Sequence, residues 1–191
     1  MKTVFILNGK PRAGKDSAIA AMTQILRCSN VAVEAFSSID PVKQMVARAG
    51  IDTSGKTPED RALWAEIGNS VEKHSQWRTQ RCFSEIAQFF NFVDDNGTGN
   101  NSAVMFLHVR EKLIIDRIAE RVNRRLDWSV LKVIMRSNRA ENVSSNAADM
   151  GVDEIEYNDE IVNNGTLDDL ARACDRLLFR NGLIEQLSLL H

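Results

Sequence analysis

The sequence predicts an α/β fold of three layers, in which a five-stranded parallel sheet carries helices on both of its faces. Two observations lead to this prediction. Five short β-prone runs alternate along the chain with segments in which apolar residues recur at helical spacing. The first run, residues 4–7, leads through a glycine-bounded loop directly into a helix. Strands that alternate with helices are typical of parallel sheets, and 191 residues suit a single domain.

The strands are predicted from runs of aliphatic, aromatic and β-branched residues that lie between polar turns. The third run, residues 103–109, is apolar almost throughout, as expected for a central parallel strand that is buried on both faces. The five predicted strands are residues 4–7, 31–36, 103–109, 130–135 and 157–162.

The helices are predicted from apolar periodicity and from residues that are typical of helix ends. One helix begins near Gly14, and the next is predicted to have Asp40 as its cap. Thr57 and Thr166 are also predicted caps, each followed by acidic residues in the first helical turn. The helices after the first are predicted over residues 41–50, from 58 onward, 82–92, 112–126 and 167–178.

The composition limits the classes of function. The net charge is −2, so no binding to bulk nucleic acid or to a membrane is expected. No apolar stretch reaches transmembrane length, and the first apolar run is too short for an export signal, so a cytoplasmic location is expected. The cysteines are widely spaced and are predicted to be reduced core thiols; they are Cys28, Cys82 and Cys174.

The predicted phosphate-binding loop is residues 9–17, with the sequence Gly-Lys-Pro-Arg-Ala-Gly-Lys-Asp-Ser. Gly9 and Gly14 let the backbone curl with its N–H groups pointing inward, and the following helix adds the positive end of its dipole. Lys15 would then reach the terminal phosphates of a nucleotide. The other residues expected to bind this phosphate donor are Lys10, Arg12, Ala13, Asp16 and Ser17.

At position 16 the loop departs from the usual Gly-Lys-Ser/Thr ending, whose hydroxyl binds Mg²⁺. A carboxylate is also a hard oxygen ligand, so Asp16 could hold Mg²⁺ directly or through water, or could act on an acceptor hydroxyl. Asp16 and Ser17 are therefore the candidate metal ligands, and Lys15 and Asp16 are candidate catalytic residues. Arg12 could clamp a phosphate or could point to water.

Basic side chains follow several of the predicted strands. Because the carboxyl ends of parallel strands meet at one edge of a sheet, these side chains should gather beside the phosphate loop. Arg110, Arg136 and Arg139 each come directly after a strand, and Lys43 lies in the helix that follows another. Helix capping alone would explain Asp40, and a solvent-exposed position would explain Lys43.

Other catalytic chemistries find little support. The three histidines lack metal-ligand spacing, no two cysteines stand at C-x-x-C distance, and no Gly-x-Ser-x-Gly elbow is present. His108 lies within an apolar run and is interpreted as a core or edge histidine.

The loop resembles the phosphate loop of phage-type deoxynucleoside monophosphate kinases, which also place Arg before a small residue and end in Gly-Lys-Asp-Thr/Ser. A Gly-Lys-Asp ending also occurs in animal phosphomevalonate kinases. Three further stretches resemble the same kinase group, namely residues 36–43, 108–111 and 163–168. The resemblance implies an adenylate-kinase-like fold, ATP as phosphoryl donor, Mg²⁺ as cofactor and a small monophosphate as acceptor.

The same resemblance implies roles for residues outside the loop. A helical region at about 41–93 would include the acceptor-binding side, and a lid-like segment at about 137–156 would close over the reacting groups. Arg136 and Arg139 would neutralise charge in the transition state. Acceptor binding is expected from Asp40, Lys43, Arg78, Arg81 and Arg110, and additional donor binding from Asn164.

Three functions remain open from the sequence alone. The first is a kinase for a deoxynucleoside monophosphate, and the second is a kinase for a non-nucleotide phosphate such as phosphomevalonate. The third is a regulatory module that binds ATP without transfer, which the missing Ser/Thr at position 16 keeps open. A slot for a nucleobase would favour the first; Trp64, Trp77 and Phe83 could line it, although periodicity favours core packing for Trp64 and Phe83.

Overall fold

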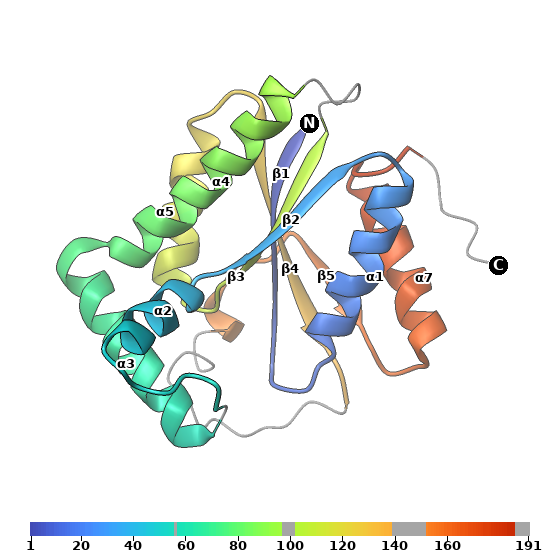
Figure 1. Cartoon of the computed structure of the whole chain (residues 1–191). Coiled ribbons are helices and arrows are strands. Elements are labelled where there is room, and N and C mark those ends of the chain that lie inside the picture. The colour runs from blue at the N-terminus through green and yellow to red at the C-terminus, as the bar shows by residue number, and fades with distance from the viewer. Residues whose placement is uncertain (56, 97–101, 139–151, 186–191) are drawn as a thin grey trace.

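The computed structural model describes residues 1–55, 57–96, 102–138 and 152–185, and these residues contain a twisted five-stranded sheet (Figure 1). All neighbouring strands are parallel, in the order β2-β3-β1-β4-β5. Each predicted strand overlaps an observed one, so the predicted fold class is confirmed. The strands are β1 (Lys2–Gly9), β2 (Ala32–Ser37), β3 (Ala103–His108), β4 (Trp128–Arg136) and β5 (Asp159–Val162).

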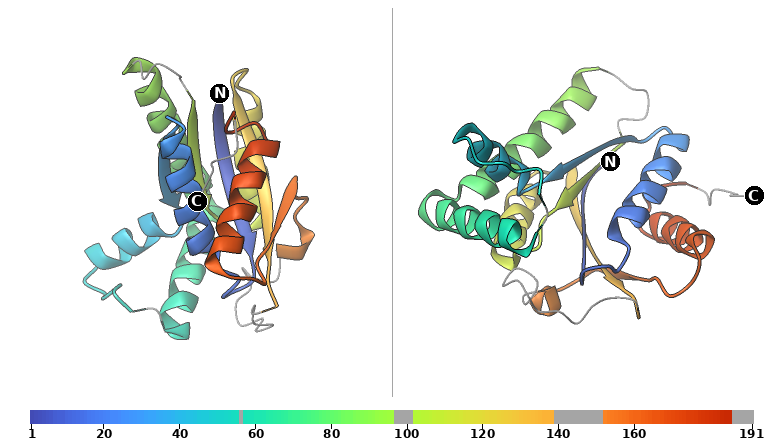
Figure 2. Two further views of the ribbon diagram at one scale, coloured as in Figure 1. Left: turned by 90° about the vertical axis from the view of Figure 1, so that its right-hand side faces the viewer. Right: turned by 60° about the horizontal axis from the view of Figure 1, so that its bottom comes forward.

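Helices cover both faces of the sheet, as Figures 1 and 2 show. Helices α1 (Lys15–Cys28) and α7 (Leu167–Arg180) lie on one face. Helices α4 (Trp77–Asp95) and α5 (Lys112–Asn123) lie on the other. Two further helices, α2 (Asp40–Arg48) and α3 (Pro58–Ser75), lie beyond the carboxyl end of β2 and extend the molecule on that side (Figure 1).

The central strand shows how the sequence builds two cores. Successive side chains of a strand point to opposite faces of the sheet. Phe5 and Leu7 therefore pack in the cluster that includes α1 and α7, whereas Val4 and Ile6 pack in the cluster that includes α4 and α5. Because all of β1 is buried, the loop that follows it starts from a rigid base.

The predicted caps were right at two helices and wrong at one. Thr57 and Thr166 both form complete capping boxes. Asp40 does not cap α2, because the helix starts one residue earlier than predicted and Ile39 occupies the cap position. Pro41 lacks an N–H and suits either of the first two helical positions, so it does not fix the helix start.

Helix α4 begins five residues before the predicted start, at Trp77 instead of residue 82. The joint with α3 is Gln76, which has a left-handed backbone with φ of 54°. Glutamine gives no typical turn signal, so the sequence did not reveal where one helix ends and the next begins.

The cysteine prediction is confirmed in part. Cys82 and Cys174 are buried, and burial raises the pKa of both thiols to about 12, so both stay protonated at neutral pH. Cys28, however, is exposed at the end of α1, so its assignment to the core was wrong. None of the helices in the described ranges combines the length and apolar character needed to cross a bilayer.

Candidate functional site

The phosphate loop connects the buried strand β1 to α1, and its two glycines are sterically required. Gly9 has φ of +147°, and a Cβ atom there would lie 2.5 Å from the carbonyl oxygen of Met135 in β4. Gly14 has φ of +94°, and a Cβ atom there would lie 2.5 Å from Nδ2 of Asn163. Any other residue at either position would distort the loop, as the sequence predicted.

Lys15 closes the loop across its own backbone. Its Nζ donates hydrogen bonds to the carbonyl oxygens of Gly9 at 2.7 Å and Lys10 at 2.8 Å. Lys15 is also the first residue of α1, so its ammonium group and the positive end of the helix dipole both lie at the loop. This geometry suits a bound phosphate, whose oxygens could accept the hydrogen bonds that Lys15 now donates to the two backbone carbonyls.

Asn163, which was not predicted as a site residue, holds the loop through a side-chain hydrogen bond. Asn163 follows β5 and is buried, and its side-chain amide donates to the carbonyl oxygen of Ala13 at 2.9 Å. The prediction named its neighbour Asn164 as a donor ligand. Oδ1 of Asn164 accepts a hydrogen bond from the backbone N–H of Asn138 at 2.8 Å, and its binding of the nucleotide stays a prediction.

The two candidate metal ligands occupy different positions. Asp16 lies in the first turn of α1 and lines the cleft beside the loop, whereas Ser17 is exposed and is not among the described residues that line it. Within the described ranges, no three His, Cys, Asp or Glu side chains form a preformed metal cluster. Mg²⁺ is commonly held by one or two carboxylates together with substrate phosphates, and Asp16 fits that mode.

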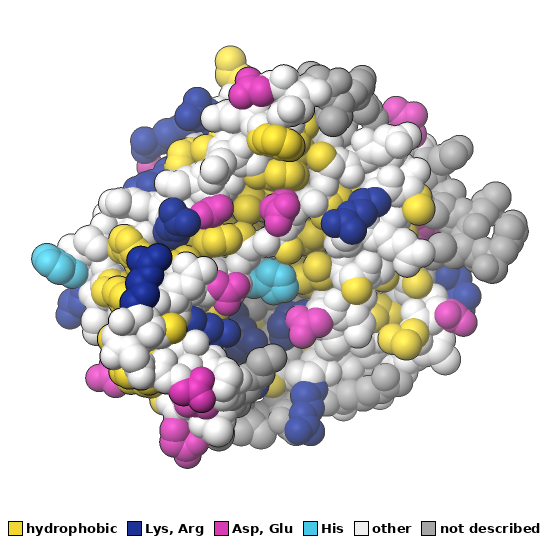
Figure 3. Space-filling model, viewed as in Figure 1, with side chains coloured by type: hydrophobic (Ala, Val, Ile, Leu, Met, Phe, Trp, Pro, Cys, Tyr) yellow, Lys and Arg dark blue, Asp and Glu magenta, His cyan; other side chains and the backbone are white. Residues whose placement is uncertain are grey.

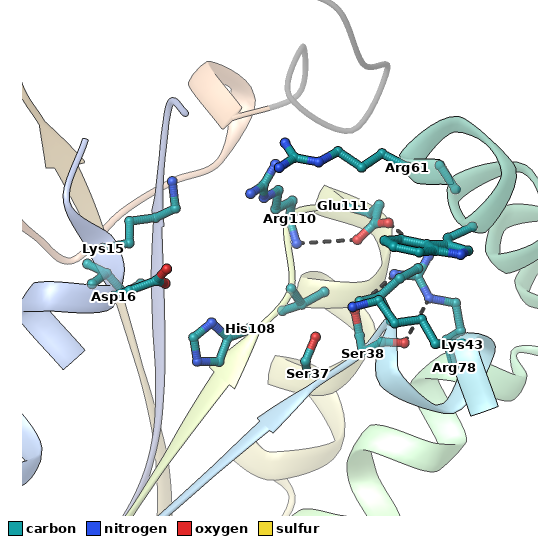
Figure 4. A pocket seen from close by; sticks show the side chains of 15 residues that line it. Lys15, Asp16, Ser37, Ser38, Lys43, Arg61, Arg78, His108, Arg110 and Glu111 are labelled. Carbon is teal, nitrogen blue, oxygen red and sulfur yellow. Dashed lines mark hydrogen bonds and ion pairs between the residues drawn. The ribbon is translucent and has the colours of Figure 1, made fainter. Parts of the chain in front are cut away.

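A cleft of about 300 Å³ opens beside the phosphate loop (Figure 4). Five Lys and Arg side chains line it against two acidic side chains, so it is locally cationic in a chain of net charge −2. Figure 3 shows basic atoms deep in a hollow, next to a histidine and several acidic side chains. The lining residues are Leu7, Lys15, Asp16, Ser37, Ser38, Ile39, Lys43, Arg61, Trp64, Ala65, Arg78, His108, Val109, Arg110 and Glu111.

Arg110 and Arg61 lie on the wall of the cleft that faces Lys15. Figure 4 shows Arg61 extending from α3 toward Arg110, which follows β3. Arg110 was predicted from its place after a strand, but Arg61 was not, because a basic residue on a predicted helix gives no signal of its own. Two guanidinium groups that face one cavity favour an anionic ligand between them.

Lys43 and Trp64 form a third part of the wall. Nζ of Lys43 lies 4.6 Å from the centroid of the Trp64 ring, within the range of a cation–π contact. The same ammonium lies 3.7 Å from a carboxylate oxygen of Asp40. Trp64 is only 5% exposed, as its predicted core packing requires, and it also lines the cleft.

Phe83 and Trp77 are absent from the described cleft lining, so only one of the three predicted slot residues is there. Phe83 packs instead against the ring of Trp128, with centroids 6.1 Å apart. The described cleft therefore offers a single aromatic edge for a ligand.

His108 ends β3 in the centre of the cleft. In Figure 4 its imidazole lies between Asp16 on one side and Ser37 on the other. Burial lowers the pKa of His108, although the charges of Asp16 and Asp40 favour protonation, so the ring is neutral at pH 7. His108 is the last residue of β3, which agrees with its interpretation as an edge histidine. It also lines the cleft, which that interpretation did not include.

Two predicted acceptor ligands are absent from the described cleft lining. Arg81 is 50% exposed on α4 and forms an ion pair with Glu85 one turn away, at 2.6 Å. Asp40 is exposed and lies beside Lys43. Both side chains are exposed, and their roles as acceptor ligands stay predictions.

Arg78 does line the cleft, but as a buried residue. Its side chain is 1% exposed and lies against Ser38 and Glu111. Neither Ser38 nor Glu111 was named as a site residue from the sequence, since each is explained locally by a turn or a helix start.

A second cavity of about 240 Å³ lies on the other side of the loop. Lys10 and Arg136 both line it, and Nε of Arg136 lies 3.3 Å from the carboxylate of Glu160 on the neighbouring strand. Arg136 thus lies near the loop but on the opposite side from Arg110. Arg139 and most of the predicted lid-like segment lie outside the described residues; residues 152–154 of that segment form a short 3₁₀ helix.

Comparisons with known proteins identify no family. No protein-family model matches the chain, and no curated protein matches it. The chain is similar to APS kinase CysC of Mycobacterium tuberculosis, with a TM-score of 0.44 and 11% identity, over 93% of this chain and 96% of that chain. It is also similar to a sugar kinase from Janibacter sp. HTCC2649, with a TM-score of 0.40 and 14% identity, over 93% and 92% of the two chains. Both likenesses are too distant to assign a function.

Proposed function

We propose that this chain is an ATP-dependent kinase that transfers a phosphoryl group to a small phosphate-bearing acceptor, a deoxynucleoside monophosphate. The observation that carries the proposal is the shared position of Lys15 and Asp16. Both belong to the phosphate loop, and both line the cationic cleft of about 300 Å³. A donor phosphate on the loop and an acceptor in the cleft would therefore meet at these two side chains.

On the donor side, the loop amides and Lys15 would hold the β and γ phosphates of ATP. Asp16 would hold Mg²⁺, which when bound neutralises charge on the transferring phosphoryl group. The chain's own contribution is positioning: Gly9 and Gly14 allow the backbone to approach the phosphates, and Asn163 keeps the loop in place.

On the acceptor side, Arg61, Arg110 and Lys43 would bind the phosphate of the acceptor. All three line the cleft from separate segments, so they surround an anion from several directions. The volume is at the lower end of small-molecule sites, which suits a compact ligand. Trp64 offers an aromatic edge for a base, and the resemblance of the loop to phage-type kinases supports the choice of nucleotide.

The neutral His108 lies where the donor and acceptor phosphates would approach each other. A neutral imidazole can donate one hydrogen bond without adding charge. We assign it to hydrogen bonding with one of these phosphates. An acceptor phosphate is already ionised at neutral pH, so the transfer itself requires no general base.

The test is release of ADP from Mg·ATP in the presence of each deoxynucleoside monophosphate, each ribonucleoside monophosphate and phosphomevalonate. Release that depends on one or more deoxynucleoside monophosphates would support the proposal and identify the acceptor. Release with phosphomevalonate alone would retain phosphoryl transfer and overturn the acceptor assignment. Binding of ATP without acceptor-dependent release would instead indicate a regulatory module.

The control is Lys15→Ala, assayed with the same panel after its fold has been checked by circular dichroism. Loss of acceptor-dependent release in this variant would place the activity at the phosphate loop. Turnover within a few-fold of wild type would contradict the assignment of the loop.

A further inference from the structure

Arg78 is a buried cation at the junction of the segments that form the acceptor side. It is the second residue of α4, and its side chain is 1% exposed. Its Nε donates to the carbonyl oxygen of Ser38 at 3.3 Å, and its Nη2 donates to the hydroxyl of Ser38 at 2.9 Å. Its Nη1 lies 2.8 Å from a carboxylate oxygen of Glu111. One guanidinium group therefore joins α4 to the turns that follow β2 and β3.

Glu111 extends this junction to an acceptor ligand. While one of its carboxylate oxygens faces Arg78, the other accepts a hydrogen bond from the backbone N–H of Arg110 at 3.3 Å (Figure 4). The turns are also tied directly, because the backbone N–H of Ser38 donates to the carbonyl of His108 at 3.0 Å. The backbone that carries Arg110 is thus held through the same carboxylate that neutralises Arg78.

Helix α3, which carries Arg61, packs against the same guanidinium. A Cβ atom added to Gly68 would lie 3.3 Å from both Cδ and Nη1 of Arg78, so the glycine makes room for the arginine. One turn later, the buried Glu72 accepts hydrogen bonds from the backbone and hydroxyl of Thr79, at 3.0 and 2.6 Å. The joint between α3 and α4 is therefore held closed next to Arg78.

We infer that Arg78 is a positioning residue: it sets where Lys43, Arg61 and Arg110 stand relative to the phosphate loop, and it does not bind the acceptor. The inference depends on the proposed function for its kinetic consequence. Its basis is geometric, because the side chain is buried, Nε and Nη2 donate to Ser38, and Nη1 forms an ion pair with Glu111, so little of the guanidinium surface is left for a ligand. A buried ion pair adds little net stability compared with apolar packing, and one supported use of such pairs is to fix a specific arrangement of segments, which is the role inferred here.

The test uses two conservative variants, Arg78→Lys and Glu111→Gln, assayed with Mg·ATP and the four deoxynucleoside monophosphates. Rates are expressed per ATP-binding site, so that any unfolded protein does not contribute. We expect kcat to fall about tenfold to a hundredfold in each variant, with KM for ATP unchanged, because misplaced reacting groups lose rate steeply. The double variant should lose little more than either single one, since both act on the same contact.

Glu111→Gln separates positioning from direct binding of the acceptor. If Arg78 were itself a ligand, removing its counter-charge would release the guanidinium and lower KM for the acceptor. That result, or kcat within twofold of wild type in Arg78→Lys, would overturn the inference. The matched control is the pair Arg124→Lys and Glu120→Gln, an exposed ion pair at the carboxyl end of α5, for which both constants should stay unchanged.

A second measurement does not depend on turnover. Amide hydrogen exchange at Ser38 and Arg110 should become about tenfold faster in Arg78→Lys, while amides of α1 stay as in wild type. If wild type transfers no phosphoryl group to any of these acceptors, the proposed function fails. The exchange rates then decide the positioning role alone: faster exchange at these amides supports it, and unchanged exchange overturns it.

Discussion

The predicted phosphate loop and the cleft wall that we propose as the acceptor side are both suited to hold an anion, but they are built differently. The loop is formed by nine consecutive residues and depends on backbone geometry at Gly9 and Gly14. The acceptor side is formed by side chains from α2, α3 and the turn after β3, which lie far apart in the sequence. Buried charged groups such as Arg78 connect these segments.

This difference has a practical consequence. A site built from backbone tolerates changes in neighbouring side chains but not in its glycines, because its donors are N–H groups that every residue other than proline provides. A site built from distant side chains depends on the contacts that bring its segments together. Substitutions in the two regions should therefore impair the protein in different ways.

The largest expected effect separates the two regions kinetically. Lys15→Ala should lower kcat about a thousandfold, since the ammonium stabilises charge on the transferring group. Arg110→Ala should instead raise KM for the acceptor about tenfold to a hundredfold, the effect of losing a charge-assisted hydrogen bond, with ATP binding unchanged. Steady-state kinetics with both substrates varied would measure this split. A parallel loss of ATP affinity in Arg110→Ala would show that the regions are not separate.

The next effect tests the role of backbone geometry in the loop. Gly14→Ala should lower the free energy of unfolding by about 3 kcal/mol, because the new Cβ combines a left-handed strain with displacement of Asn163. Gly50→Ala is the matched control, since Gly50 has a similar φ of +82° but no described atom within 4 Å of an added Cβ. It should cost only about 1 kcal/mol. If urea denaturation showed that both variants lose the same free energy of unfolding, the contact with Asn163 would contribute nothing.

A smaller effect concerns the buried charges beneath the acceptor side. Burial acts to raise the pKa of Glu72, but hydrogen bonds from Thr79 and Arg117 outweigh it and hold that pKa below its usual value of 4.5. A lowered pKa stabilises the fold above pH 4.5, and this stabilisation is lost as the pH falls through the folded-state value. Glu72→Gln should therefore be less stable than wild type by about 2 kcal/mol at pH 7.

Acid titration of the unfolding free energy checks this sign. The difference between wild type and Glu72→Gln should shrink as the pH falls below about 4.5. A constant difference down to pH 2 would show that the carboxylate of Glu72 does not account for the loss.

The smallest effect is expected at Arg81, which the sequence placed among the acceptor ligands. Arg81→Ala removes an exposed ion pair with Glu85 and should change the unfolding free energy by no more than about 0.5 kcal/mol. KM for the acceptor should stay within twofold of wild type. A tenfold rise in that KM would restore Arg81 to the site.

Sequence reasoning was most accurate where structure is local. The strand, glycine-bounded loop and helix at the start of the chain were located correctly because their signals lie within one short stretch. Thr57 and Thr166 were recognised as caps for the same reason, since a capping box spans only four residues. The error at Asp40 arose because two neighbouring positions suit the helix start almost equally well, and the start of α4 was misplaced because Gln76 gives no typical turn signal.

Non-local contacts account for what was missed. Local sequence explains each of the missed residues without a site. Arg61 suits the surface of a helix, Glu111 suits the start of a helix, and Asn163 suits a turn. Their roles follow only when the parallel sheet brings the ends of β1, β2, β3 and β5 to one edge. Arg81 and Arg78 are three residues apart on α4, yet one is exposed and the other buried, which is decided by the packing of α3 and α5.

The sequence by itself determined the alternation of strands and helices and the position of the glycine-bounded loop after β1, because both depend on residue spacing and on the φ values open to glycine. Only the tertiary structure decided which cations face the cleft and which are neutralised within the protein. That choice depends on the partner of each side chain, and partners such as Glu111 for Arg78 lie more than thirty residues away in the chain.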